Sequence, residues 1–304
     1  MNTQERAAGQ APPALMPTIR ALADLKRVRS AGRAGSVAER LFASAWAQVA
    51  AGEDVEEVAR TTTAAALAAT VLGDLAADVG RGGYLPTEEL EAIARQVTEE
   101  VAAPLDPALR AWIAEAEPAV PTGAAPAFVA ALAAQPRAGV TAPGRGRILF
   151  DPTENHAEHC LLVAVAGVVL SPAFGARPET VFLAGLAHHL HNATLADAGF
   201  AGEVALGDHL VPVFERATAA ALAQLHAEVR ARVEAARAVL PDAWTPEGQA
   251  FHAADTLDRV LQVEHHLRAA GTTMGFVLHE MELVHEGPVR PFQMALLRRM
   301  GLDG

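Results

Sequence analysis

Three histidines and one aspartate occur along this chain in an order that suits a metal site. His159 comes first, His188 and His189 follow as a doublet, and Asp255 lies much further along. Imidazole and carboxylate groups are ligands that manganese, iron, cobalt, nickel and zinc accept in proteins. The four positions therefore predict a site for one divalent transition metal, whose identity the sequence leaves open.

Helices must bring these four residues together, because alanine and leucine dominate the chain around them. Helices are predicted over three segments that carry the candidate ligands: 154–170, 179–193 and 245–270. In an all-α protein, such ligands point inward from facing helices. Adjacent residues of a helix diverge by about 100°, so His188 and His189, placed within one helix, are expected to straddle the ion.

The rest of the chain also favours helix over strand, so the predicted fold class is all-α. Alanine, leucine, glutamate and arginine are abundant, whereas aromatic residues make up 5% of the 304 residues. Ser36 and Glu39 form a capping box at a helix start, and Gly52 ends that helix. Further helices are predicted over 15–28, 37–51, 53–79 (with a kink), 86–103, 107–112, 128–134, 206–240 and 291–300. Residues 272–286 fit either helix or loop.

Proline, glycine and alanine concentrate in 118–147, which is predicted to be a linker. It separates an N-terminal helical region, 14–117, from a metal-binding domain, 148–304. Residues 1–13 are predicted to be a disordered tail. The N-terminal region has no histidine before His156. It could dock on the metal-binding domain, cover its pocket or form a homodimer interface.

Charge and cysteine content restrict the partners. The net charge is −12, with no basic face for nucleic acid. A small anionic substrate remains possible, because a bound cation sets the local field. Cys160 is the only cysteine, which fits a reducing cytoplasm and a packing role in the core. The most apolar run, 161–170, is about half as long as a bilayer span, so no membrane association is predicted.

The same positions resemble the HD-domain superfamily of metal-dependent phosphohydrolases, most closely its nucleotidase-like branch. The likeness covers about 149–268 and extends to further positions: Glu154, Glu158, Cys160, Glu203, Gly207, Asp208, Ala254, Leu257 and Asp258. It implies an HD-like helical bundle with an additional N-terminal region. It also implies hydrolysis of a small phosphate ester, such as a nucleoside monophosphate, by a metal-activated water.

The second doublet residue departs from that family, which has aspartate where this chain has His189. Loss of one carboxylate favours transition metals over magnesium. It also removes a group that could accept the water's proton. Glu158, Glu203 or Asp208 would then act as the general base. The alternative is that His189 does not bind and that the site is inert.

Two other functions stay open at this stage. His209 and His226 could hold a second metal, which would resemble the diiron oxygenases of the same superfamily. A catalytically degenerate HD protein would instead serve regulation or interaction. Arg259 is expected to pair with Asp258 or Glu264 at the surface rather than to bind substrate. Four other residues are left between pocket and surface positions: His156, His191, Asn192 and His252.

Overall fold

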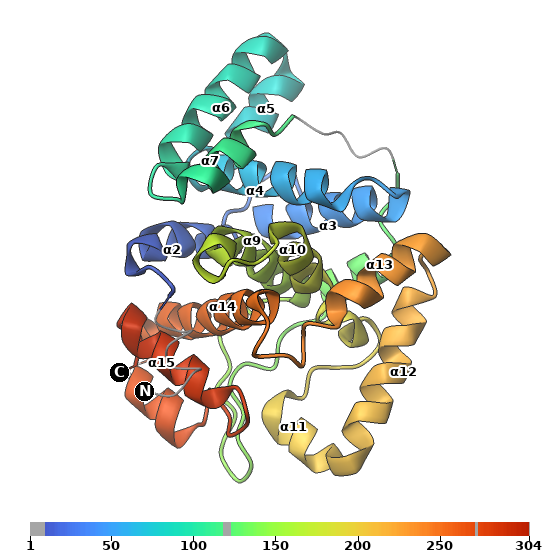
Figure 1. Cartoon of the computed structure of the whole chain (residues 1–304), viewed down its shortest axis with the longest axis vertical. Helices are drawn as coiled ribbons and strands as arrows, with labels where there is room; N and C mark the ends of the chain where they lie inside the picture. Colours follow the sequence, from blue (N-terminus) through green and yellow to red (C-terminus); the bar gives the residue numbers. More distant parts are fainter. Residues whose placement is uncertain (1–9, 118–122, 271–272, 304) are drawn as a thin grey trace.

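The computed structural model describes residues 10–117, 123–270 and 273–303, and helices dominate it (Figure 1). Within these ranges no β-strand occurs, only isolated bridges, so the all-α prediction is confirmed. In chain order the N-terminal elements are η1 (Pro13–Leu15), α2 (Met16–Asp24), α3 (Val37–Ala51), α4 (Val55–Leu72), α5 (Leu75–Gly82), α6 (Thr87–Ala102), α7 (Pro107–Ala114) and α8 (Ala127–Ala134). They are followed by α9 (His156–Phe174), α10 (Pro178–Ala187), η2 (Leu190–Ala193), α11 (Gly199–Leu206), η3 (Gly207–His209), α12 (Leu210–Leu222), α13 (Ala227–Arg237), α14 (Pro246–Ala270), η4 (Phe276–Glu280) and α15 (Arg290–Met300).

Helix α9 is the centre of the molecule (Figure 1). It is apolar on all sides, as a helix surrounded by others must be, and it packs against α10, α14, α3 and α8. Asn155 and Glu158 form a capping box at its start, each side chain bonded to the other's backbone N–H. This cap fixes the first turn of α9, and His159 lies within that turn.

Helix α9 is also long and apolar enough to cross a membrane by length and composition alone. However, 89% of that stretch is buried inside the protein, as expected of a core helix. The pair α4 and α5 passes the same test only if it is taken as one span, and it is bent by 91°.

The helix that carries the histidine doublet is shorter than predicted. Helix α10 ends at Ala187, so the expectation of a helix over 179–193 is wrong beyond that residue. His188 is the C-cap and His189 lies in the following turn, before η2. Because the chain leaves the helix here, the two rings are not held about 100° apart by helical geometry. Their centroids lie 4.2 Å apart.

Close packing of α10 on α9 depends on Gly185. A Cβ atom at this position would lie 2.6 Å from Cα and 2.7 Å from N of Ala164. We expect Gly185→Ala to lower the free energy of unfolding by about 1–3 kcal/mol, because backbone atoms must move apart. Urea denaturation measures this loss. Gly32→Ala is the matched control, since nothing lies within 4 Å of its Cβ position. An equal effect of both substitutions would contradict the packing explanation.

The N-terminal region packs directly on the region predicted to bind metal, and buried apolar side chains of both form one cluster. Helix α3 lies on α9, and α4 lies on α10. The cap at Ser36 and the stop at Gly52 are confirmed. Gly73 splits the helix predicted over 53–79 into α4 and α5, which corresponds to the expected kink. The helix predicted over 206–240 is likewise broken into η3, α12 and α13.

The segments predicted to be a tail and a linker are described only in part. Residues 1–9 and 118–122 lie outside the described residues. Ala11 is buried, and η1 begins at Pro13. The predicted linker contains α8, near the position expected for a short helix, and Phe128 is part of the core. Its last part, after α8, leads to the candidate metal centre.

Candidate metal centre

Three of the four predicted ligands converge from three separate elements. Nε2 of His159 on α9 lies 3.0 Å from Nε2 of His188 at the end of α10. The same atom of His159 lies 3.3 Å from Oδ1 of Asp255 on α14. The corresponding distance from His188 Nε2 to Asp255 Oδ1 is 3.9 Å. Three side chains that are remote in sequence therefore lie together in space.

The contacts of Nδ1 in His159 and His188 determine whether the Nε2 atom of each ring carries a proton. Nδ1 of His159 lies 2.7 Å from Oδ2 of Asp258, and Nδ1 of His188 lies 2.7 Å from the carbonyl oxygen of Gly185. Both partners accept, so both Nδ1 atoms carry the proton and both Nε2 atoms present lone pairs to each other. Two lone pairs at this distance repel unless a cation or proton lies between them. In a tetrahedral zinc site, ligand nitrogens are separated by about 3.3 Å, so these residues fit a divalent metal.

The ring of His189 makes contacts different from those of His159 and His188. His159, His188 and His189 form a group whose ligand atoms could hold a metal ion. In this arrangement, however, Nδ1 of His189 donates to Asn192 Oδ1 at 3.0 Å. Its Nε2 lies 3.2 Å from Nη1 of Arg137, and a guanidinium can only donate. Ligation by His189 stays a prediction, and it would require Arg137 to withdraw.

The charge state of the cluster suits a cation. Burial lowers the pKa of His188 and that of His189 well below the ordinary value, so both rings are neutral at pH 7. Burial opposes ionisation of Asp255, but the proximity of His159 and the charge of Arg259 outweigh burial and lower its pKa. Neutral imidazoles and an ionised carboxylate are the protonation states that metal ligands need.

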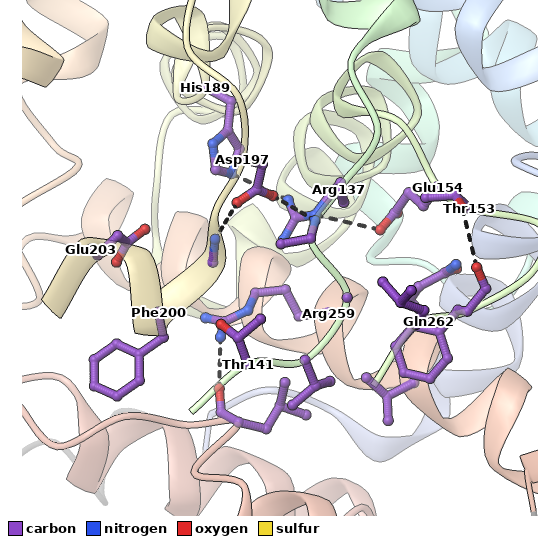
Figure 2. Close-up of a pocket in the computed structure, with 18 of the residues that line it drawn as sticks. Arg137, Thr141, Thr153, Glu154, His189, Asp197, Phe200, Glu203, Arg259 and Gln262 are labelled. Carbon is purple, nitrogen blue, oxygen red and sulfur yellow. Dashed lines mark hydrogen bonds and ion pairs between the residues drawn. The ribbon is translucent and has the colours of Figure 1, made fainter. Parts of the chain in front are cut away.

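A cavity of about 280 Å³ opens over the cluster (Figure 2). His188, His189 and Asp255 line it, together with the guanidinium groups of Arg137 and Arg259. Its remaining walls combine acidic and apolar side chains: Glu154, Asp197, Glu203, Val140, Leu149, Phe150, Phe200, Val263 and Leu283. A polar end near the cluster and apolar walls elsewhere are what a small-molecule site requires.

Arg259 does not make the surface pairs expected of it. Its Nη2 donates to the carbonyl oxygen of Leu283 at 2.6 Å, and its Nη1 lies 3.8 Å from Oδ2 of Asp255. The expected partners are engaged elsewhere, because Asp258 pairs with Lys26 and Glu264 pairs with Arg20. Arg259 is therefore directed into the cavity.

Of the three predicted general bases, only Glu203 lines the cavity. Burial raises its pKa, and the neighbouring charge of Asp197 adds to this. Glu158 is buried. Its carboxylate forms part of the capping box of α9 and pairs with Arg29 at 3.2 Å, so it is engaged at the start of that helix. Asp208 is exposed in η3 and does not line the cavity.

The histidines proposed for a second metal are not brought to the cluster. His209 and His226 are both exposed, and neither lines the cavity. His156 is fully buried beside His189, with ring centroids 4.7 Å apart, and its Nε2 lies 3.5 Å from Asp197 Oδ2. His191 stacks on Phe214. Cys160 is buried, as predicted for a packing residue.

Two basic residues of the site were missed from the sequence. Arg137 lies in the predicted linker, where nothing local marks it as functional. Lys26 follows α2 in the N-terminal region, and its ammonium group contacts Glu154 and Asp258. Burial opposes the charge on Lys26, but these two carboxylates outweigh burial and raise its pKa. One signal was present in the sequence: Lys26 is the only lysine in the chain.

Comparison with protein-family models, with curated proteins and with solved structures finds no match to this chain.

Proposed function

We propose that this protein is a metal-dependent phosphohydrolase that binds one divalent ion per chain and hydrolyses a small phosphate ester, such as a nucleoside monophosphate. One observation carries the proposal. Nε2 of His159 converges with His188 and Asp255, and these last two residues line the same cavity as Arg137 and Arg259. A cation site beside two arginines is suited to an anionic group with several oxygens.

His159, His188 and Asp255 would hold the ion, since each presents a free ligand atom to the others. When bound, a divalent transition metal supplies a Lewis acid and lowers the pKa of a coordinated water. The protein's own contribution is to fix the ligands. Asp258 and the Gly185 carbonyl hold the two rings in the tautomer that directs Nε2 to the centre.

Arg137 and Arg259 would bind the phosphate oxygens. Arg137 is held from two sides, by His189 Nε2 at 3.2 Å and by Glu154 Oε2 at 3.7 Å from its Nε. Arg259 is held by the Leu283 carbonyl and by Asp255. A guanidinium presents several donors in one plane, which matches the geometry of phosphate oxygens. In this proposal His189, which replaces the aspartate of the HD superfamily, supports Arg137 through its Nε2.

Glu203 is the carboxylate best placed to accept or return a proton. It extends from α11 into the cavity (Figure 2). A carboxyl group whose pKa is raised toward neutrality is a better general base than one at its ordinary value. Asp197 is less free for this role, because its oxygens accept from the backbone N–H groups of Ala138 and Gly199 at 2.9 and 2.8 Å.

Metal-stripped protein tests the proposal directly. Protein purified without a histidine tag and treated with a chelator would be assayed for phosphate release from a panel of phosphomonoesters. We expect no release before a metal is added, and release after addition of manganese, cobalt, iron, nickel or zinc. Stoichiometric metal binding without hydrolysis of any ester would contradict the proposal and favour a regulatory HD protein. Oxygen-dependent turnover with two irons would favour the oxygenase.

A further inference from the structure

We infer that Lys26 is a positioning residue of the metal centre and that the N-terminal helical region thereby completes the site. This inference extends the proposed function, because it concerns how the same centre is assembled. It is carried by a continuous chain of buried contacts that runs from the ammonium group of Lys26 to His159. None of these contacts lies at the surface.

Lys26 lies just after α2, which packs between α9 and α14. Its ammonium group contacts Oε1 of Glu154, just before α9, and Oδ1 of Asp258 on α14. The three side chains are 3%, 6% and 2% exposed. Burying ions this deeply costs free energy, which close contacts between opposite charges must offset. Lys26 therefore joins three segments that are remote in sequence.

Asp258 transmits this contact to the metal ligand. One carboxylate oxygen is held by Lys26, and the other accepts from Nδ1 of His159 at 2.7 Å. With both oxygens engaged, the carboxylate cannot rotate away from the ring. Nε2 of His159 is consequently directed at His188 and Asp255. Mutation of a carboxylate that supports a metal-bound histidine commonly changes metal affinity.

Glu154 connects Lys26 to Arg137. Its Oε1 is held by Lys26, and its Oε2 lies 3.7 Å from Nε of Arg137. Arg137 in turn contacts His189 and lines the cavity. A single ammonium group thus supports both the ligand side and the arginine side of the site.

The residue type agrees with this position. Lysine occurs once in the chain and arginine 23 times, and the one lysine lies between two buried carboxylates. An ammonium group is a compact point charge, whereas a guanidinium is larger and planar. Glu154, His159 and Asp258 also form a group that could hold a metal ion. The lysine supplies the positive charge at that position, which leaves one ion for the centre described above.

The experiment compares three variants after metal removal. Lys26→Met breaks the network, and Lys26→Met with Glu154→Gln breaks it without leaving two unpaired carboxylates. Arg20→Met is the matched control, because Arg20 lies in α2, shortly before Lys26, and also pairs with α14, through Glu264, without reaching His159. Cobalt(II) affinity is measured by competition with a coloured chelator. The tautomer of His159 is read from nitrogen NMR of the metal-free protein, and unfolding is followed by circular dichroism.

We expect cobalt affinity to fall on the order of tenfold or more in both Lys26 variants and to stay unchanged in Arg20→Met. The metal-free Lys26 variants should also lose the single Nδ1–H tautomer of His159. A folded double variant with parental cobalt affinity and parental tautomer would overturn the inference, as would equal losses in Arg20→Met. If the parent binds no metal, the proposed function fails. The tautomer comparison then still decides whether Lys26 positions His159.

Discussion

Replacing His188 by alanine is expected to lower the affinity for a divalent metal by more than about 100-fold, since the loss of a ligand should exceed the loss of a supporting hydrogen bond. His188 contributes one of three converging atoms, and Asp255 and His159 cannot replace it from their own elements. Hydrolysis of the phosphate ester should fall with metal occupancy. Cobalt or zinc titration of metal-free protein measures the effect.

His226→Ala is the control for this substitution. It also removes one imidazole, but from an exposed position at the start of α13. We expect it to bind metal like the parent protein. Loss of metal in His226→Ala, or retention of full affinity in a folded His188→Ala, would show that the ion binds elsewhere.

Arg137→Met is expected to lower kcat for phosphate ester hydrolysis by about 100- to 1,000-fold, the range seen when one donor to a developing charge is removed. Metal content should stay at the parental level, because Arg137 contacts no predicted ligand except His189. Arg137→Lys should not restore the rate, since one ammonium group cannot replace a planar fork. Steady-state kinetics and elemental analysis of the same samples check both statements.

Arg145→Met provides the comparison for Arg137. Arg145 comes from the same predicted linker but is exposed and pairs with Glu280 at 3.7 Å. Its kinetics should match those of the parent. Parental kcat in folded Arg137→Met would remove the phosphate-binding role. A simultaneous loss of metal would mean instead that Arg137 supports the ligands.

Local signals explain what the sequence predicted well. Ser36 with Glu39, and Gly52, act within one turn of the helix ends they define, and the structure places those ends there. The end of α10 was missed because no glycine or proline occurs in the ten residues after His188. Leucine and alanine continue the helical pattern there, and only tertiary contacts reveal the break.

The sequence predicted the candidate-site residues whose type alone indicates a metal ligand. Histidine and aspartate have few roles other than metal ligation in apolar helices. This applies to His159, His188 and Asp255. Arg137 and Lys26 gave no such signal, because arginine in a loop or a basic residue after a helix is ordinarily solvated. Their role depends on contacts across 128 residues in the case of Lys26 and Glu154, which no local pattern encodes.

Counting metal in the purified protein tests the central claim most directly. The chain would be produced without a histidine tag, supplied with divalent transition metals, freed of excess by gel filtration and measured by elemental analysis. We predict one divalent ion per chain in the parent and substantially less in His188→Ala. A folded parent that retains no metal, or that retains two ions per chain, would contradict the account.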